Sequence, residues 1–123
     1  MAQEVEYIDD NQVITHAVCE AAEWLGLTRE QLAQIIGVSK SNIARYRSGS
    51  ASIRDPKNFE LSLILIRVYR AIFSIVGGNK EQMRHWIKTP NYHFASRSPL
   101  QMMETVEGLT TVTRYLDGMR GRL

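Results

Sequence analysis

The segment from residue 27 to residue 49, LTREQLAQIIGVSKSNIARYRSG, constrains the fold more than any other part of the chain. Thr28 can cap a short helix, and Gln31 three residues later can complete a capping box. Gly37 then allows a sharp turn after the helix, and Ser39 can cap a second one. A helix, a glycine turn and a second helix at this spacing predict a helix-turn-helix.

The two short helices have distinct inner and outer faces. The residues expected to face inward are Leu32, Ile35, Ile36, Ile43 and Tyr46. The second helix then presents short polar groups and positive charge outward, on Lys40, Ser41, Asn42, Arg45 and Arg47. An ordinary helical hairpin could also have a solvated polar face. The combination of Ala33, Gly37, Ile43 and the capping Ser39 favours DNA binding instead.

This segment resembles the phage-repressor-like, or Xre-type, helix-turn-helix. The resemblance implies that Lys40, Ser41 and Arg45 read base edges, with Asn42 beside them and Arg47 further along the same helix. It also implies that Arg29, at the start of the first helix, lies over a phosphate together with the free amides of that helix.

Charge is distributed unevenly along the 123 residues, although the net charge is only +2. Residues 1–27 contain six acids and no Lys or Arg, whereas residues 28–57 contain six bases and two acids. The basic middle fits a surface that meets phosphate. The acidic start fits either a basic partner or a solvated tail.

Several classes of protein are disfavoured. The longest apolar run, from Phe59 to Val76, carries two arginines in its middle, which predicts a core helix and not a membrane span. The start lacks the basic and apolar segments of a secretory signal, so we expect a cytoplasmic protein, nucleoid-associated when bound to DNA. The single cysteine, Cys19, is expected to be a buried small hydrophobe. The histidines are scattered, so we expect no catalytic residue, metal or cofactor, and no enzyme.

The pattern along the chain predicts an all-α fold with three parts. Residues 1–9 are expected to be a flexible arm, residues 10–57 the helix-turn-helix domain, and residues 58–123 a small helical domain for binding or dimerisation. We expect a loop from Ser50 to Lys57 and a long helix from Phe59 to Val76. A final helical stretch should begin at Ser98-Pro99 and break near Gly108.

The C-terminal half carries a second ordered set of motifs, W-I-x-T-P-N at 86–91 and S-P-L-x-x-M-x-T-x-E-G at 98–108. This order is similar to the toxin-binding domain of the MbcA/ParS/Xre antitoxins. The chain departs from that family in the loop 94–97, which lacks the usual glycine before Pro99. It departs again after Leu116, where Gly118 and Gly121 suggest a flexible end.

The resemblance implies an antitoxin that binds and inhibits a RES-domain toxin, which would degrade NAD⁺ or transfer ADP-ribose from it. It also implies a homodimer that represses its own operon by binding operator DNA. The toxin cleft could be filled by the Glu104 and Glu107 carboxylates or by the C-terminal carboxylate of Leu123. Alternatively, basic side chains could pair with acidic groups of the toxin; these are Arg114, Arg120 and Arg122. The competing interpretation is a stand-alone homodimeric Xre-family repressor without a toxin.

Overall fold

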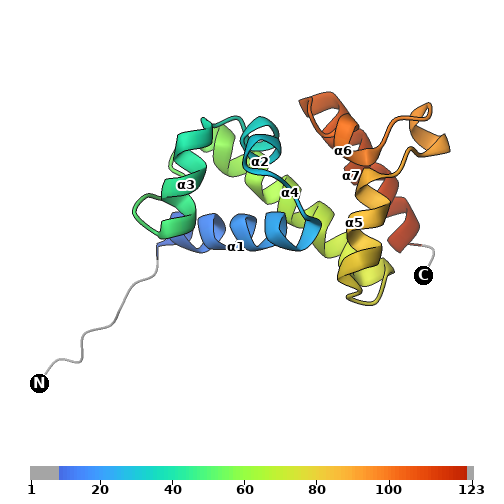
Figure 1. Cartoon of the computed structure of the whole chain (residues 1–123), viewed down its shortest axis with the longest axis horizontal. Helices are drawn as coiled ribbons and strands as arrows, with labels where there is room; N and C mark the ends of the chain where they lie inside the picture. Colours follow the sequence, from blue (N-terminus) through green and yellow to red (C-terminus); the bar gives the residue numbers. More distant parts are fainter. Residues whose placement is uncertain (1–8, 122–123) are drawn as a thin grey trace, which may run out of the picture.

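The computed structural model describes residues 9–121, and these residues form α-helices with one 3-10 turn and no sheet (Figure 1). The all-α prediction is therefore confirmed for the described part of the chain. The elements are α1 (Asp10–Leu25), α2 (Arg29–Ile36), α3 (Lys40–Ser48), α4 (Pro56–Ile75), α5 (Lys80–Lys88), η1 (Tyr92–Phe94), α6 (Pro99–Met102) and α7 (Val106–Arg120).

The long helix α4 is the axis of the molecule. It packs on α1 and α2 and also on α7 and α5 (Figure 1). Leu65, Val68 and Ile72 of α4 are almost fully buried, whereas Leu63 is 43% exposed. One hydrophobic cluster extends from Leu32 to Leu116, so the two halves of the chain share a core through α4. The division at residue 57 stays a prediction.

The helix-turn-helix forms as the sequence predicts. Thr28 and Gln31 make the capping box of α2, and Ser39 caps α3. Gly37 between them has φ +77°, a left-handed conformation that suits glycine. Local capping chemistry therefore fixes both ends of the turn between α2 and α3.

Two expected boundaries were wrong. The loop from Ser50 to Lys57 ends earlier than predicted, because Asp55 caps α4 and Pro56 occupies its first turn. The break expected near Gly108 lies instead at residues 103–105, and Gly108 is inside α7. A Cβ at position 108 would lie 1.8 Å from the carbonyl oxygen of Met102. Gly108 therefore permits the close approach of α6 and α7 and does not end a helix.

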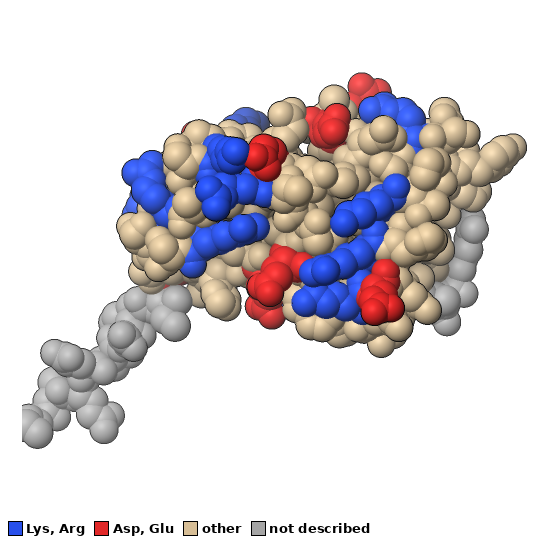
Figure 2. Space-filling view, viewed as in Figure 1, with Lys and Arg blue, Asp and Glu red and all other residues tan. Residues whose placement is uncertain are grey.

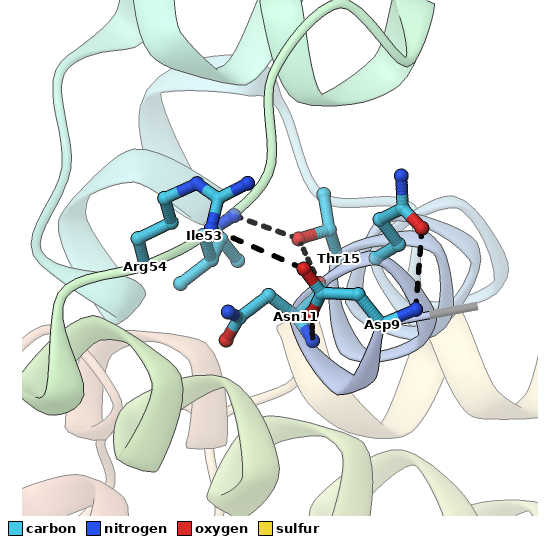
Figure 3. A network of polar contacts seen from close by, with 6 residues as sticks. Asp9, Asn11, Thr15, Ile53 and Arg54 are labelled. Atoms are coloured by element: carbon cyan, nitrogen blue, oxygen red, sulfur yellow. Dashed lines mark hydrogen bonds and ion pairs between the residues drawn. The ribbon is translucent and has the colours of Figure 1, made fainter. Parts of the chain in front are cut away.

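The loop between α3 and α4 is held against the start of α1 (Figure 3). The backbone N–H of Ile53 donates to the Thr15 hydroxyl over 2.8 Å, and that hydroxyl donates to the Asn11 carbonyl over 2.6 Å. Arg54 also lies 3.9 Å from the Asp9 carboxylate. Because Ile53 and Thr15 are both buried, this connection ties the exit of α3 to the first turns of α1.

No helix of the described chain is both long enough and apolar enough to cross a bilayer. Of the predicted arm, residues 1–8 lie outside the described residues, and Asp9 is the N-cap of α1. Cys19 is only half-buried and not fully buried as expected, because its face of α1 borders an open cleft.

Candidate functional site

Helix α3 is anchored on one side and open on the other. Ile43 is fully buried and Tyr46 is half-buried, while Lys40, Ser41 and Arg45 are exposed. The Ser39 hydroxyl accepts the backbone N–H of Asn42 over 3.2 Å, which closes the first turn of α3. The structure thus brings the three predicted base-reading side chains onto one exposed surface, with Asn42 at its edge.

A contact from α4 fixes the turn that precedes α3. The side-chain amide of Asn58 donates to the carbonyls of Ile36 and Gly37, over 2.9 Å and 3.1 Å. These carbonyls lie at the end of α2, where no further helical partner is available. The sequence analysis missed Asn58, because its partners are 21 and 22 residues away and no local pattern marks the contact.

Two of the predicted base readers are paired within the protein. The Lys40 ammonium lies 2.5 Å from the Glu30 carboxylate at the start of α2. The hydrogen bond from Lys40 lowers the pKa of Glu30, and the Glu30 backbone and the charge of Lys40 lower it further. The Arg45 guanidinium donates to the side-chain oxygen of Asn42. DNA binding would therefore exchange these internal partners for groups on the nucleic acid.

Arg29 and Arg47 lie on either side of this surface. Arg29 is exposed at the first position of α2, next to Glu30 and hence near the start of α3. Arg47 is directed toward α1, where it borders an open cleft together with His16, Cys19 and Glu20. The structure therefore separates Arg47 from Ser41 and Arg45. Basic side chains gather over α3 in the space-filling view, with a second group over α5 (Figure 2).

Cys19 lies beside Arg47 but is not activated as a nucleophile. Burial raises the pKa of the Cys19 thiol, and the positive charge of Arg47 opposes this effect only in part. A thiol with a raised pKa is mostly protonated at neutral pH and therefore a poor nucleophile. Within residues 9–121, no group of three or more His, Cys, Asp and Glu side chains is placed to hold a metal ion.

The predicted toxin-binding residues do not form one cluster. Glu104 and Glu107 are exposed near the start of α7, and Arg120 is exposed in its last turn. At 1.5 Å per residue, Glu107 and Arg120 are separated by about 20 Å along the helix. Arg114 is exposed between them. Arg122 and Leu123 lie outside the described residues.

The two halves of the molecule are joined by polar contacts as well as by their core. The Arg84 guanidinium, on α5, donates to the carbonyls of Glu23 and Trp24 at the end of α1, over 2.7 Å and 3.3 Å. The Gln34 amide, on α2, donates to the carbonyl of Glu104 over 3.2 Å. Neither contact has a local sequence signal, because the partners are 60 to 70 residues apart.

Comparison with known proteins finds two families whose models match successive parts of the chain. The antitoxin Xre-like helix-turn-helix domain matches residues 15–63. The antitoxin Xre/MbcA/ParS C-terminal toxin-binding domain matches residues 70–122. No curated protein matches the chain.

Among solved structures, the chain is similar to one chain in the crystal structure of the M. tuberculosis MbcT-MbcA toxin-antitoxin complex. The TM-score is 0.68 at 25% sequence identity, and the match covers 90% of this chain and 96% of that chain. The similarity therefore extends over both halves and over their arrangement around α4. With an antitoxin helix-turn-helix followed by an antitoxin toxin-binding domain, the chain belongs to the Xre/MbcA/ParS antitoxins of toxin–antitoxin systems.

Proposed function

We propose that this antitoxin binds and inhibits a cognate RES-domain toxin, which degrades NAD⁺ or transfers ADP-ribose from it. We further propose that the antitoxin represses its own operon as a homodimer bound to operator DNA. Both partners belong to the cytoplasm, and the antitoxin would lie on the nucleoid when it is bound to its operator. The antitoxin itself supplies no catalytic group and needs no cofactor for either task.

The DNA-binding part of the proposal is supported by the surface of α3. Ser41 and Arg45 are exposed, and α3 is fixed by its cap, by Ile43 and by the contact from Asn58 to the preceding turn. A helix held in this way can enter the major groove and offer donors to base edges. Arg29 and the free amides at the start of α2 are suited to a phosphate.

The toxin-binding part of the proposal is supported by the C-terminal half and by the motifs within it. The RES type of the toxin rests on the ordered motifs W-I-x-T-P-N and S-P-L-x-x-M-x-T-x-E-G. A toxin that binds a dinucleotide needs a positively charged cleft for its phosphates. The exposed carboxylates of Glu104 and Glu107 could occupy such a cleft, whereas Arg114 and Arg120 could pair with acidic groups at its edge.

The single observation that carries the proposal is the shared helix α4. It packs on α1 and α2 and also on α5 and α7. A DNA-reading helix and a toxin-binding domain are thereby held on one core. A stand-alone repressor would need a dimerisation surface but would not need a toxin-binding domain.

The test combines two assays on the wild-type chain. The neighbouring toxin gene is expressed from an inducible promoter with and without the antitoxin, and cell growth is followed. Binding of purified antitoxin to its own promoter DNA and to random DNA is measured by fluorescence anisotropy. We expect the antitoxin to restore growth. Depletion of NAD⁺ or ADP-ribosylation should occur only when the toxin is expressed without the antitoxin. The purified antitoxin should bind its promoter DNA more tightly than random DNA. Promoter binding without any toxic neighbour would favour the stand-alone repressor.

A further inference from the structure

A continuous row of aromatic side chains crosses the C-terminal half of the molecule. We name it the aromatic ridge, and it consists of Tyr92, His93, Tyr115 and Trp86. The ring centroids are 5.9 Å apart for Tyr92 and His93, 5.0 Å for His93 and Tyr115, and 6.3 Å for Tyr115 and Trp86. The residues come from the loop after α5, from α7 and from α5, so only the folded chain assembles the ridge.

Tyr92 begins the ridge and is 90% exposed, the highest exposure among the large hydrophobic side chains of the described residues. Burying an aromatic ring is favourable, yet none of the residues 9–121 covers the ring of Tyr92. Single exposed aromatics are common and need no explanation. Tyr92 differs because its ring is the first of a row of neighbouring aromatic rings that reaches α7 and α5.

The loop that carries Tyr92 is tightly held. The backbone N–H of Asn91 donates to the Arg97 carbonyl over 3.0 Å, and the N–H of Ser96 donates to the Asn91 carbonyl over 3.1 Å. Phe94 is 4% exposed and anchors the loop in the core. Ala95 and Ser96 both have positive φ, a conformation that non-glycine residues rarely adopt. Such strain often marks a functional segment, and a fixed loop loses little entropy when its tip is bound.

The other end of the ridge opens into an apolar depression. Its volume is about 60 Å³. Its lining comes from α4, α5 and α7: Ile72, Ile75, Val76, Trp86, Leu116 and Met119. Trp86 belongs to both features, so the ridge and the depression form one surface. The combination of a projecting tyrosine with an apolar depression is typical of protein–protein hot spots.

The ridge is separated from the helix that is predicted to read DNA. Helix α3 lies at one end of the molecule, and the loop after α5 lies at the other (Figure 1). The tip that projects at the far end carries no charged side chain on the face shown in Figure 2. The whole surface lies within residues 70–122, the part that matches the toxin-binding domain.

We infer that the aromatic ridge and its apolar depression are a principal docking surface for the toxin. This inference rests on the proposed function. The toxin would offer a pocket for the Tyr92 ring, with an apolar segment to fill the depression. The complementary toxin surface is therefore apolar at its centre.

The inference differs from the electrostatic contacts expected from the sequence. Glu104 and Glu107 lie near the start of α7, whereas Tyr115 and Met119 lie in its second half. If the ridge anchors the toxin, the main loss of affinity comes from removing a ring and not from removing a carboxylate. Interface hot spots are concentrated in aromatic and arginine side chains.

The experiment compares four full-length variants in binding to the purified neighbouring toxin. Tyr92→Ala removes an exposed ring that makes no core contact, and we expect its Kd for the toxin to rise at least about tenfold. Tyr92→Phe retains the ring and should stay within about threefold of wild type. Val13→Ala removes an apolar side chain that is 48% exposed on α1, and it serves as the matched control. Glu107→Gln tests the carboxylate contact.

Each outcome decides between the surfaces. Tyr92→Ala with wild-type affinity for the toxin would overturn the inference, as would a larger loss for Glu107→Gln. A wild-type chain that does not bind the toxin would instead remove the proposed function. The ridge could instead contact a second copy of the chain. Analytical ultracentrifugation of wild type and Tyr92→Ala tests this alternative by measuring the oligomeric state. Loss of the dimer with unchanged toxin affinity would assign the ridge to dimerisation and overturn the inference.

Discussion

The helix-turn-helix at one end of α4 and the toxin-binding domain at the other are built by different means. In the helix-turn-helix, each helix begins at a capping side chain, and Gly37 turns the chain between α2 and α3. Every one of these devices acts within three or four residues. Local sequence signals therefore set the ends of α2 and α3, and the contact from Asn58 adds a long-range support to the turn between them.

In the toxin-binding domain, two turns are held by contacts between residues six positions apart in the chain. Its central loop reaches positive φ at Ala95 and Ser96 without any glycine, because the bridge between Asn91 and Arg97 holds it. The turn from α6 into α7 depends on the close approach of Gly108 to the Met102 carbonyl. Substitutions should therefore act mainly through helix capping in the first region, but through the packing of neighbouring elements in the second.

The largest effect predicted by this difference is that of Gly108→Ala. The added methyl group would lie 1.8 Å from the Met102 carbonyl oxygen, so α6 and α7 must separate. We expect the free energy of unfolding to fall by about 3 kcal/mol or more. Urea unfolding followed by tryptophan fluorescence measures this change, and toxin binding should be lost with it.

Gly118→Ala is the matched control for this prediction. Position 118 is also inside α7, but a Cβ there would have no neighbour within 4 Å. Alanine should stabilise the helix at that position by about 0.5–1 kcal/mol. Equal effects of the two substitutions would show that α6 and α7 are not held by the close approach at Gly108.

The same contrast explains which parts of the fold could be predicted from the sequence. The helices α1 to α3 were predictable because caps, turns and apolar spacing all agree locally. The wrong start of α4 had a readable signal, since Asp55-Pro56 is a helix start as well as a break. Gly108 was read as a helix break because glycine has low helix propensity, although its role is steric.

The candidate sites were predictable to different extents. Lys40, Ser41 and Arg45 share one surface because helical periodicity places them there. Arg47 faces α1 instead, which periodicity on α3 alone does not reveal. The contacts of Asn58 and Arg84 join segments far apart in the chain and have no local signal. The aromatic ridge was missed for the same reason, since Trp86, Tyr92 and Tyr115 meet only after folding.

The next prediction separates the two surfaces functionally. Arg45→Ala should weaken binding to the operator by about 1–3 kcal/mol if the guanidinium reads a guanine, and it should leave toxin neutralisation intact. Fluorescence anisotropy with operator and random DNA measures the first effect, and growth rescue measures the second. Arg114→Ala, an exposed arginine on α7, should leave operator binding unchanged. If Arg45→Ala loses the same affinity for operator and random DNA, Arg45 contacts a phosphate and not a base.

A smaller effect is expected where the two regions meet. Arg84→Ala removes two hydrogen bonds to the last carbonyls of α1, and these carbonyls are partly accessible to water. We expect the free energy of unfolding to fall by about 1 kcal/mol. Gln34→Ala removes one exposed contact to Glu104 and should cost less than about 0.5 kcal/mol. A larger loss for Gln34→Ala would show that the main polar connection joins α2 to the turn between α6 and α7.

The smallest effect concerns the ion pair of Glu30 and Lys40, which joins the start of α2 to the start of α3. Because the hydrogen bond from Lys40 lowers the pKa of Glu30, the pair stabilises the folded state above the unfolded value of about 4.3. That stabilisation is lost as the pH falls through the lower, folded pKa. Thermal unfolding of wild type and Glu30→Gln should therefore differ slightly at pH 7 and converge in acid.

Glu60→Gln, which changes an exposed carboxyl on α4, is the control. High salt should reduce the difference at pH 7, since the pair is exposed. A Glu30→Gln variant that is more stable than wild type at pH 7 would mean that ionised Glu30 destabilises the fold and that its pair with Lys40 contributes nothing.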